Sequence, residues 1–117
     1  PLVDEEEEPE ETKEEEELEE NRIRWTRQAK EENDPKAQFN LGKIFHKSPI
    51  ARDWKAAIYW YRRAAEQNHA EAQFNLGKMC EEGLGVQLDE KEALKWYKRA
   101  DDQGHKGARS ALKVISD

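Results

Sequence analysis

The chain has 117 residues, of which 40% are charged and 35% hydrophobic, and its formal net charge is −7. This length suits one small domain, and no stretch approaches the run of about 20 apolar residues that a membrane-spanning helix needs. The single cysteine, Cys80, excludes an internal disulfide and favours a reducing compartment such as the cytoplasm.

The charge is divided unevenly along the chain. Residues 4–20 hold 13 acidic residues and one lysine, a net charge of −12, whereas residues 21–117 carry a net charge of +5. Because such a charge density resists collapse, we predict an acidic low-complexity tail or linker over residues 1–17, disordered over 1–10. Two alternatives remain open. In the first, glutamates from about residue 14 onward extend the first helix. In the second, the tail folds across a basic surface of this chain or of another molecule.

Residues 37–43, with the sequence Ala-Gln-Phe-Asn-Leu-Gly-Lys, recur without change as residues 72–78. A period of 35 or 36 residues is typical of helical repeat proteins, in which each unit buries its apolar face against its neighbours. Because the chain starts at Pro1 and opens in mid-repeat, we expect it to be part of a longer protein. We predict one repeat domain over 18–117, made of a half unit (18–34), two units (35–70 and 71–105) and a terminal helix (106–117).

Aspartate residues predict where several helices begin. Asp34 followed by Pro35 supplies an N-cap and a proline at the first helical position. Asp53 and Asp89, which lie 36 residues apart, are the predicted N-caps of two helices that carry a Trp-Tyr pair. Together with apolar residues at i, i+4, i+7 and i+8, these caps predict six helices, over residues 18–32, 36–47, 53–67, 71–82, 89–103 and 106–116.

Asparagine and glycine predict where three of these helices end. Asn33, Asn68 and Gly104 occupy equivalent positions after them, and these residue types adopt the left-handed conformation most readily. Two other glycines, Gly42 and Gly77, lie inside predicted helices, where glycine costs about 1 kcal/mol relative to alanine. We therefore expect the backbone to approach the neighbouring helix closely at these two positions, against the Trp-Tyr pair.

The connections inside the two units differ. Residues 83–86, Gly-Leu-Gly-Val, predict a tight turn in which the glycines permit positive φ and the apolar residues pack on the core. The first unit has residues 47–52 at this place, shorter by one residue and without glycine. We therefore expect the two loops to differ in shape.

Three sequence elements follow one another in these units: A-x-x-x-L-G-x-x-(aromatic), then G-x-G-V, then D-x-x-x-A-x-x-W-Y-x-x-A. The pattern resembles the Sel-one-like repeat family, which is related to the tetratricopeptide repeats, over residues 25–112. The resemblance implies an all-α fold, a right-handed α/α solenoid of antiparallel helix pairs, and a role as adaptor or scaffold in protein complexes. The first unit lacks G-x-G-V, and Ser110 and Lys113 replace phenylalanine and glycine, which fits a terminal helix without a following partner.

No arrangement of reactive residues predicts an enzyme, a metal site or a cofactor. His69 and His105 are repeat equivalents in separate turns, about 10 Å apart, too far to share a metal at a bond length of about 2 Å. Cys80 occupies the core position that Phe45 holds in the first unit. Adjacent carboxylates point in different directions around their helices, so none forms a catalytic pair. We therefore predict a protein without enzymatic activity, metal or cofactor.

Basic residues recur on the second helix of each unit and stack into a possible basic ridge. We favour the interpretation that they solvate the outer face, because the acidic tail would compete with a phosphate backbone, and we expect no nucleic acid. The alternative function is a structural subunit of a larger assembly, whose basic ridge binds an acidic segment of its own tail or of a partner. The ridge comprises Arg22, Arg24, Arg27, Lys30, Arg62, Arg63, Lys98 and Arg99.

The main functional prediction is that a peptide or helix of another protein binds on the concave face, which the first helix of each unit lines. Repeated asparagine and lysine residues there can hydrogen-bond a peptide backbone and hold a carboxylate, while phenylalanine supplies apolar contact. The alternative for the phenylalanines is packing between units. The predicted partner-binding residues are Lys36, Phe39, Asn40, Lys43, His46, Phe74, Asn75 and Lys78, with Glu71 and Glu82 beside them.

Overall fold

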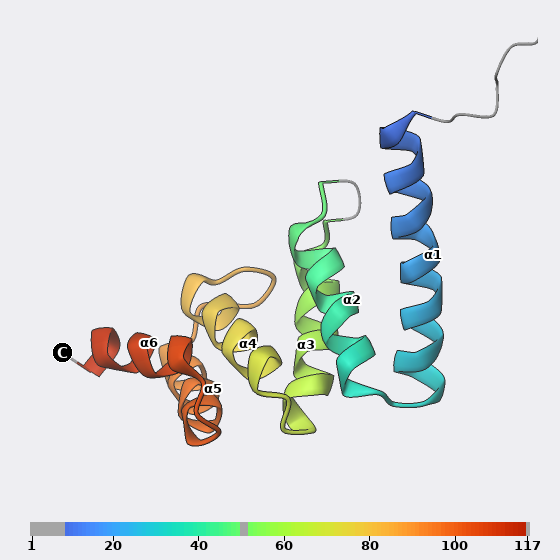
Figure 1. Ribbon diagram of the computed structural model, residues 1–117. Helices are drawn as coiled ribbons and strands as arrows, with labels where there is room; N and C mark the ends of the chain where they lie inside the picture. Colours follow the sequence, from blue (N-terminus) through green and yellow to red (C-terminus); the bar gives the residue numbers. More distant parts are fainter. Residues whose placement is uncertain (1–8, 50–51, 117) are drawn as a thin grey trace, which may run out of the picture.

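The structure, a computed structural model, describes residues 9–49 and 52–116, and these residues form six helices and no strand. Each helix packs mainly against the helices before and after it, and the chain reverses direction from one helix to the next (Figure 1). The result is an elongated body of 69 × 30 × 26 Å. The predicted all-α architecture is confirmed. The helices are α1 (Glu10–Glu31), α2 (Pro35–Lys47), α3 (Trp54–Glu66), α4 (Ala70–Glu82), α5 (Glu90–Asp102) and α6 (Lys106–Ser116).

The predicted caps define most of these helix ends. The carboxylates of Asp34, Asp53 and Asp89 accept hydrogen bonds of 2.9 to 3.1 Å from backbone N–H groups in the first turns of α2, α3 and α5. These bonds satisfy donors that have no partner inside the helix. The residues predicted to end the preceding helices have the expected left-handed backbone, with φ of 52° at Asn33, 70° at Asn68 and 88° at Gly104.

Two clusters of buried side chains form the core. The larger cluster joins α3, α4, α5 and α6 and includes the fully buried Tyr61 and Tyr97. The smaller cluster joins α1, α2 and α3 around Leu41. A Cβ atom at Gly77 would lie 2.8 Å from Cε1 of Tyr97, and Gly42 faces Tyr61 in the same way. The predicted close approach at both glycines is confirmed, and the tyrosine of each Trp-Tyr pair is the residue that needs the space.

The turn over residues 83–86 has the predicted form. Both of its glycines have φ of 72°, and its leucine and valine pack against the larger core cluster. The backbone N–H of Asp89 donates to the carbonyl of Cys80 at 2.9 Å and closes the loop, and the equivalent bond in the first unit measures 2.7 Å. The predicted difference in shape of the 47–52 loop involves residues 50–51, which lie outside the described residues.

Helix α1 begins at Glu10, earlier than the predicted start at residue 18 and the alternative start near residue 14. Glu10 and Glu11 occupy its first turn, where negative charge interacts favourably with the helix dipole. Because glutamate is also a good helix former, local propensity outweighs the repulsion between neighbouring carboxylates. The helical interpretation of the acidic segment therefore holds for residues 10–17. The rest of the predicted disordered segment, residues 1–8, lies outside the described residues, and the domain boundary after residue 17 stays a prediction.

Candidate partner-binding face

The eight predicted partner-binding residues come from α2 and α4, and we call the surface that they share the α2–α4 face. None of them is fully buried. Three of the residues are exposed, namely Lys36, Lys43 and Lys78, and five are half-buried, namely Phe39, Asn40, His46, Phe74 and Asn75.

The two lysines of the repeated heptapeptide adopt the same arrangement in both units. The Nζ atom of Lys43 lies 5.0 Å from the ring centroid of Phe39, and that of Lys78 lies 5.7 Å from the ring centroid of Phe74. At this distance the face of the ring attracts the ammonium group. The ion pairs among the described residues include neither lysine. Both ammonium groups are therefore positioned by a ring, while no carboxylate in the described part of the chain forms an ion pair with either.

The hydroxyl group of Tyr61 joins residues from both units of the face. Its oxygen lies 3.1 Å from Nδ1 of His46 and also hydrogen-bonds to Asn75. Burial raises the pKa of Tyr61, an effect that the bond to Asn75 only partly offsets, so the hydroxyl stays protonated. Burial, followed by the positive charge of Lys47, lowers the pKa of His46. The side chains of His46 and Asn75 are thus both oriented by the buried hydroxyl group of Tyr61.

The second unit has a carboxylate where the first has this histidine. The hydroxyl of Tyr97 donates a 2.6 Å hydrogen bond to Oε1 of Glu81, the residue equivalent to His46. Burial is the largest cause that raises the pKa of Tyr97, and the bond to Glu81 acts in the same direction. Glu82, which was predicted to lie beside this face, is exposed, but Glu81 is the residue that makes the equivalent contact.

The phenylalanines of the face pack between units. The ring of Phe39 stacks on the imidazole of His69 with centroids 4.8 Å apart, and the ring of Phe74 stacks on His105 at 4.6 Å. Each phenylalanine therefore contacts the turn that begins the next unit. Their recurrence is explained by packing between units, which the sequence left open as an alternative. Both residues nevertheless remain only half-buried.

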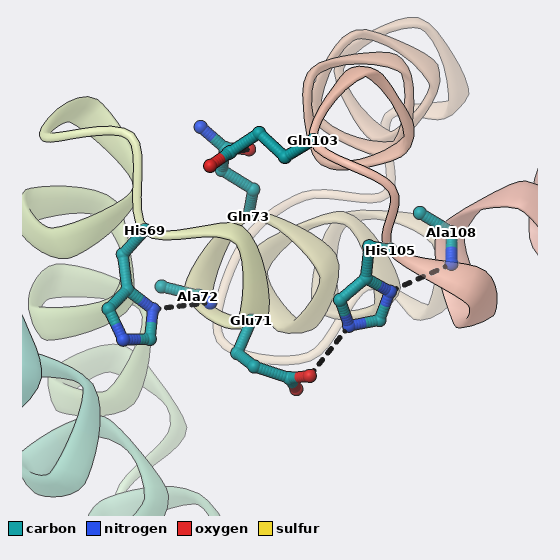
Figure 2. Close-up of polar contacts among 7 residues, drawn as sticks. All are labelled: His69, Glu71, Ala72, Gln73, Gln103, His105 and Ala108. Carbon is teal, nitrogen blue, oxygen red and sulfur yellow. Dashed lines mark hydrogen bonds and ion pairs between the residues drawn. The ribbon is translucent and has the colours of Figure 1, made fainter.

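These histidines are helix N-caps, a role that the sequence analysis did not assign. Nδ1 of His69 accepts a hydrogen bond from the backbone N–H of Ala72 at 3.2 Å, and Nδ1 of His105 accepts one from Ala108 at 3.0 Å (Figure 2). Because Nδ1 of His105 is an acceptor, the proton is on Nε2, which donates to Glu71 at 2.8 Å. Both imidazoles are therefore neutral where they cap.

The signal for this role was present in the repeat alignment. His69 and His105 fall 35 and 71 residues after Asp34, so all three occupy one position of the repeat. Asp34 was recognised as a cap because aspartate is a common N-cap residue. Histidine is not a common N-cap residue. The equivalence of His69 and His105 to Asp34 in the repeat was the observation that would have identified them as caps.

Gln73 forms a buried amide cluster with its neighbours, which the sequence analysis also missed. Its Nε2 donates to the carbonyl of Ala65 at 3.1 Å and to Oδ1 of Asn68 at 3.3 Å, and its Oε1 accepts from Gln103 at 3.0 Å. Figure 2 shows the amides of Gln73 and Gln103 next to each other. The cluster recurs one unit earlier, formed by Gln38, Asn33 and Gln67. The glutamine of the heptapeptide therefore has a structural role.

The basic ridge is largely engaged in contacts within the chain. Arg62 forms a 2.6 Å ion pair with Glu92. Other arginines lie over tryptophan rings, with Arg99 at 4.8 Å from the centroid of Trp96. Arg24 and Arg63 make similar but longer contacts with the equivalent tryptophans. These contacts favour a structural role over nucleic-acid binding for the ridge.

The reactive groups in the described part of the chain form no metal site. No group of three or more histidine, cysteine, aspartate or glutamate residues there is arranged to hold a metal ion. Cys80 is fully buried in the larger core cluster, and burial is the main cause that raises its pKa to about 11. Among the described residues, no helix is both long enough and apolar enough to cross a membrane.

The sequence and the fold are similar to those of known repeat proteins. The Sel1 repeat model matches residues 35–69 and 70–105, more than half of the chain, and no curated protein gives a significant match. A Sel1 repeat protein from Oxalobacter formigenes is 43% identical over 73% of this chain and 35% of its own length, with a TM-score of 0.69. A protective antigen of uropathogenic Escherichia coli with an SLR fold is 33% identical over 77% of this chain and 20% of its own, with a TM-score of 0.70.

A third structure, Helicobacter pylori cysteine-rich protein B, is 26% identical over 68% of this chain and 61% of its own length, with a TM-score of 0.64. The chain thus spans less than two thirds of each of these proteins. The similarity confirms the predicted α/α solenoid. Sel1 repeat proteins are generally non-catalytic adaptors and scaffolds for protein–protein interaction. With two matched repeats, the same helix-pair architecture and the repeated packing of glycine against tyrosine, this chain belongs to the Sel1 repeat family.

Proposed function

We propose that this protein is an adaptor that binds a peptide or a helix of a partner protein on the α2–α4 face. Membership of the Sel1 repeat family supports protein–protein interaction as the general function. The choice of this face depends on the side chains of this chain, because solenoids of one family bind different partners through different surface residues.

The observation that carries the proposal is the matched pair of Lys43 and Lys78. Both are exposed, both lie over a phenylalanine ring, and neither takes part in an ion pair of the described residues. Packing of the solenoid does not require a lysine at this position, since α6 has Val114 there and packs against α5. Two exposed positive charges, positioned in the same way in consecutive units, suit a ligand that carries carboxylates along its length.

The asparagines beside these lysines add hydrogen-bonding capacity. Asn40 and Asn75 precede the lysines by three residues, which places them on the same side of their helices. A side-chain amide both donates and accepts, so it can bond to a peptide N–H or C=O group. Asn75 is additionally held by Tyr61. A ligand on this face would therefore meet an amide and an ammonium group in each unit.

Charge reversal at the two lysines tests the proposal. We would compare the proteins captured from a lysate of the source organism by the unaltered chain and by the Lys43→Glu/Lys78→Glu variant. The matched control is Lys55→Glu/Lys91→Glu, because these exposed lysines are also repeat equivalents but lie on α3 and α5. It has the same net charge as the test variant.

We expect the test variant to lose its partners and the control to retain them, and we expect capture to weaken as ionic strength rises. Circular dichroism would establish that both variants are folded. Retention of every partner by the test variant would show that the α2–α4 face is not the binding surface.

A further inference from the structure

We propose that the pocket between α1 and α2 receives an apolar side chain of an acidic peptide and thereby anchors the partner at one end of the α2–α4 face. This inference rests on the proposed function and specifies the chemistry of the ligand. We call the cavity the α1–α2 pocket. It has a volume of about 460 Å³ and is lined by Leu18 and Trp25 of α1, by Asn40, Lys43, Ile44 and Lys47 of α2, and by Ser48, which follows α2.

The floor of the pocket is apolar. Leu18, Trp25 and Ile44 belong to or pack against the smaller core cluster, so they are held in place by the solenoid. Trp25 is half-buried, whereas the equivalent Trp60 and Trp96 are only 7% and 2% exposed. A half-buried indole that lines a cavity gains from contact with an apolar ligand group. Pockets of a few hundred Å³ with an apolar lining are typical of ligand sites.

The rim of the pocket selects the charge of the ligand. Lys43 and Lys47 both line it, and its lining contains no carboxylate. Helix α2 as a whole contains three lysines and no acidic residue. A basic peptide would meet only like charges here, whereas aspartate or glutamate residues beside the anchor would pair with the lysines. Lys43 is held over Phe39 at 5.0 Å, so its ammonium group is already near the rim before a ligand binds.

The acidic part of α1 fixes the side on which the ligand's carboxylates lie. A neighbouring cavity, which shares Leu18 and Ser48 with the α1–α2 pocket, is lined by Glu11, Glu14 and Glu15. A peptide that extended in that direction would place its carboxylates against these glutamates. An acidic peptide anchored at Trp25 is therefore directed along α2 toward α4, where Lys78 provides the next positive charge. The pocket and the row of lysines thus form one continuous surface for a ligand that is apolar at one end and acidic beyond it.

The inference is tested with synthetic peptides and the full chain. The probes are a library of fluorescein-labelled peptides that carry two apolar residues at one end and acidic residues beyond it. Because the chain direction of the ligand is not fixed, both Xaa-Xaa-Asp-Glu-Asp-Glu and Asp-Glu-Asp-Glu-Xaa-Xaa are used, in which Xaa is Leu, Ile, Phe or Trp. Two control series carry Ser-Ser in place of the apolar pair, or Lys and Arg in place of the acidic residues. Binding is measured by fluorescence anisotropy, and the indole N–H signals of the protein are followed by NMR, with Trp25→Phe to assign the signal of Trp25.

We expect at least one acidic peptide with an apolar end to bind about tenfold more tightly than either control series. Its binding should shift the indole signal of Trp25 and leave that of Trp96, which donates to Glu92, unchanged. Lys47→Glu should weaken binding about tenfold, whereas Lys98→Glu, an equally exposed lysine on α5, should have little effect.

Several outcomes would overturn the inference. If no peptide of the library binds, or if Ser-Ser peptides bind as well as the others, the pocket is not an apolar anchor. If the Trp25 signal moves with protein concentration alone, a second copy of the chain fills the pocket instead. Binding of acidic peptides that depends on Lys43 and Lys78 but not on Lys47 would refute the pocket while leaving the proposed function intact. Retention of natural partners by the Lys43→Glu/Lys78→Glu variant would refute the proposed function itself.

Discussion

The side-chain amide of Gln103, at the C-terminal end of α5, donates a 3.0 Å hydrogen bond to Oε1 of Gln73 in α4. Gln73 is fully buried, and its own amide nitrogen donates to the carbonyl of Ala65 in α3. Gln73 therefore obtains its partners from the helix before it and the helix after it. Because a buried amide is costly when it is unsatisfied, this contact links the positions of three consecutive helices.

Replacing Gln73 with alanine should destabilise the solenoid by about 1–3 kcal/mol, because the carbonyl of Ala65 and the amide of Gln103 lose a buried partner. The free energy of unfolding is measured by urea denaturation. Gln87→Ala is the matched control, since Gln87 is an exposed loop residue. Equal stability of the two variants would show that the amide cluster contributes nothing measurable.

Gly77→Ala should also destabilise the protein, although alanine is the better helix former. The added methyl group would lie 2.8 Å from Cε1 of Tyr97, and this ring is fully buried and cannot move aside. Overpacking of this kind costs about 1–3 kcal/mol, which exceeds the gain of about 1 kcal/mol in helix propensity. Thermal unfolding followed by circular dichroism measures the change.

A double-mutant cycle with Tyr97→Leu identifies the cause. If the methyl group clashes with the tyrosine ring, Gly77→Ala should cost less in the Tyr97→Leu background than in the unaltered chain. Equal costs in both backgrounds would place the strain elsewhere. Gly104→Ala is a useful comparison, because nothing lies within 4 Å of a Cβ there and only its φ of 88° opposes a side chain.

Stability should fall as the pH decreases below about 6.5. Burial is the main cause that lowers the pKa of His69 and of His46 from their ordinary value of 6.5, whereas Glu71 acts to raise that of His69. Above pH 6.5 both histidines are neutral in the folded and the unfolded chain, so their contribution is fully present. Below it the unfolded chain binds protons first, and stability is lost until the pH reaches the folded-state pKa. Urea midpoints at pH 7.5 and 5.5 measure the loss.

His69→Asp separates the cap from the titration. Aspartate occupies the equivalent position in Asp34, where it caps α2. The variant should keep the N-cap of α4 and show a smaller loss of stability between pH 7.5 and 5.5, with the remainder due to His46. An unchanged pH dependence would mean that protonation of His69 does not oppose folding.

Much of the fold could be predicted because each helix boundary has a local cause. Asp34, Asp53 and Asp89 cap the helices that they were expected to cap, and Asn33 and Asn68 adopt the left-handed backbone. These are interactions over a few residues, so the sequence pattern contains them directly. The close approach at Gly42 and Gly77 was also predictable, since a glycine that recurs inside helices indicates a steric requirement.

The site was harder to predict because its contacts cross from one unit to the next. The stacking of Phe39 on His69 and the bond from Gln103 to Gln73 join residues that are about 30 positions apart. The sequence shows that such residues recur, but not which partner each one meets. The same limit applies to Glu81, whose bond to Tyr97 depends on the orientation of α4 relative to α5.

Removal of residues 1–17 tests the predicted domain boundary. In the described part of this segment every residue but Thr12 is exposed, whereas Leu18 and Trp25 pack against the smaller core cluster. The shortened α1 would still begin with Glu19 and Glu20 near the positive end of its dipole. We therefore expect the free energy of unfolding of residues 18–117 to change by less than about 0.5 kcal/mol, while the helical circular dichroism signal decreases by the amount that residues 10–17 contribute. A loss of more than about 2 kcal/mol would mean that the acidic half of α1 belongs to the cooperative unit and that the domain begins near Glu10.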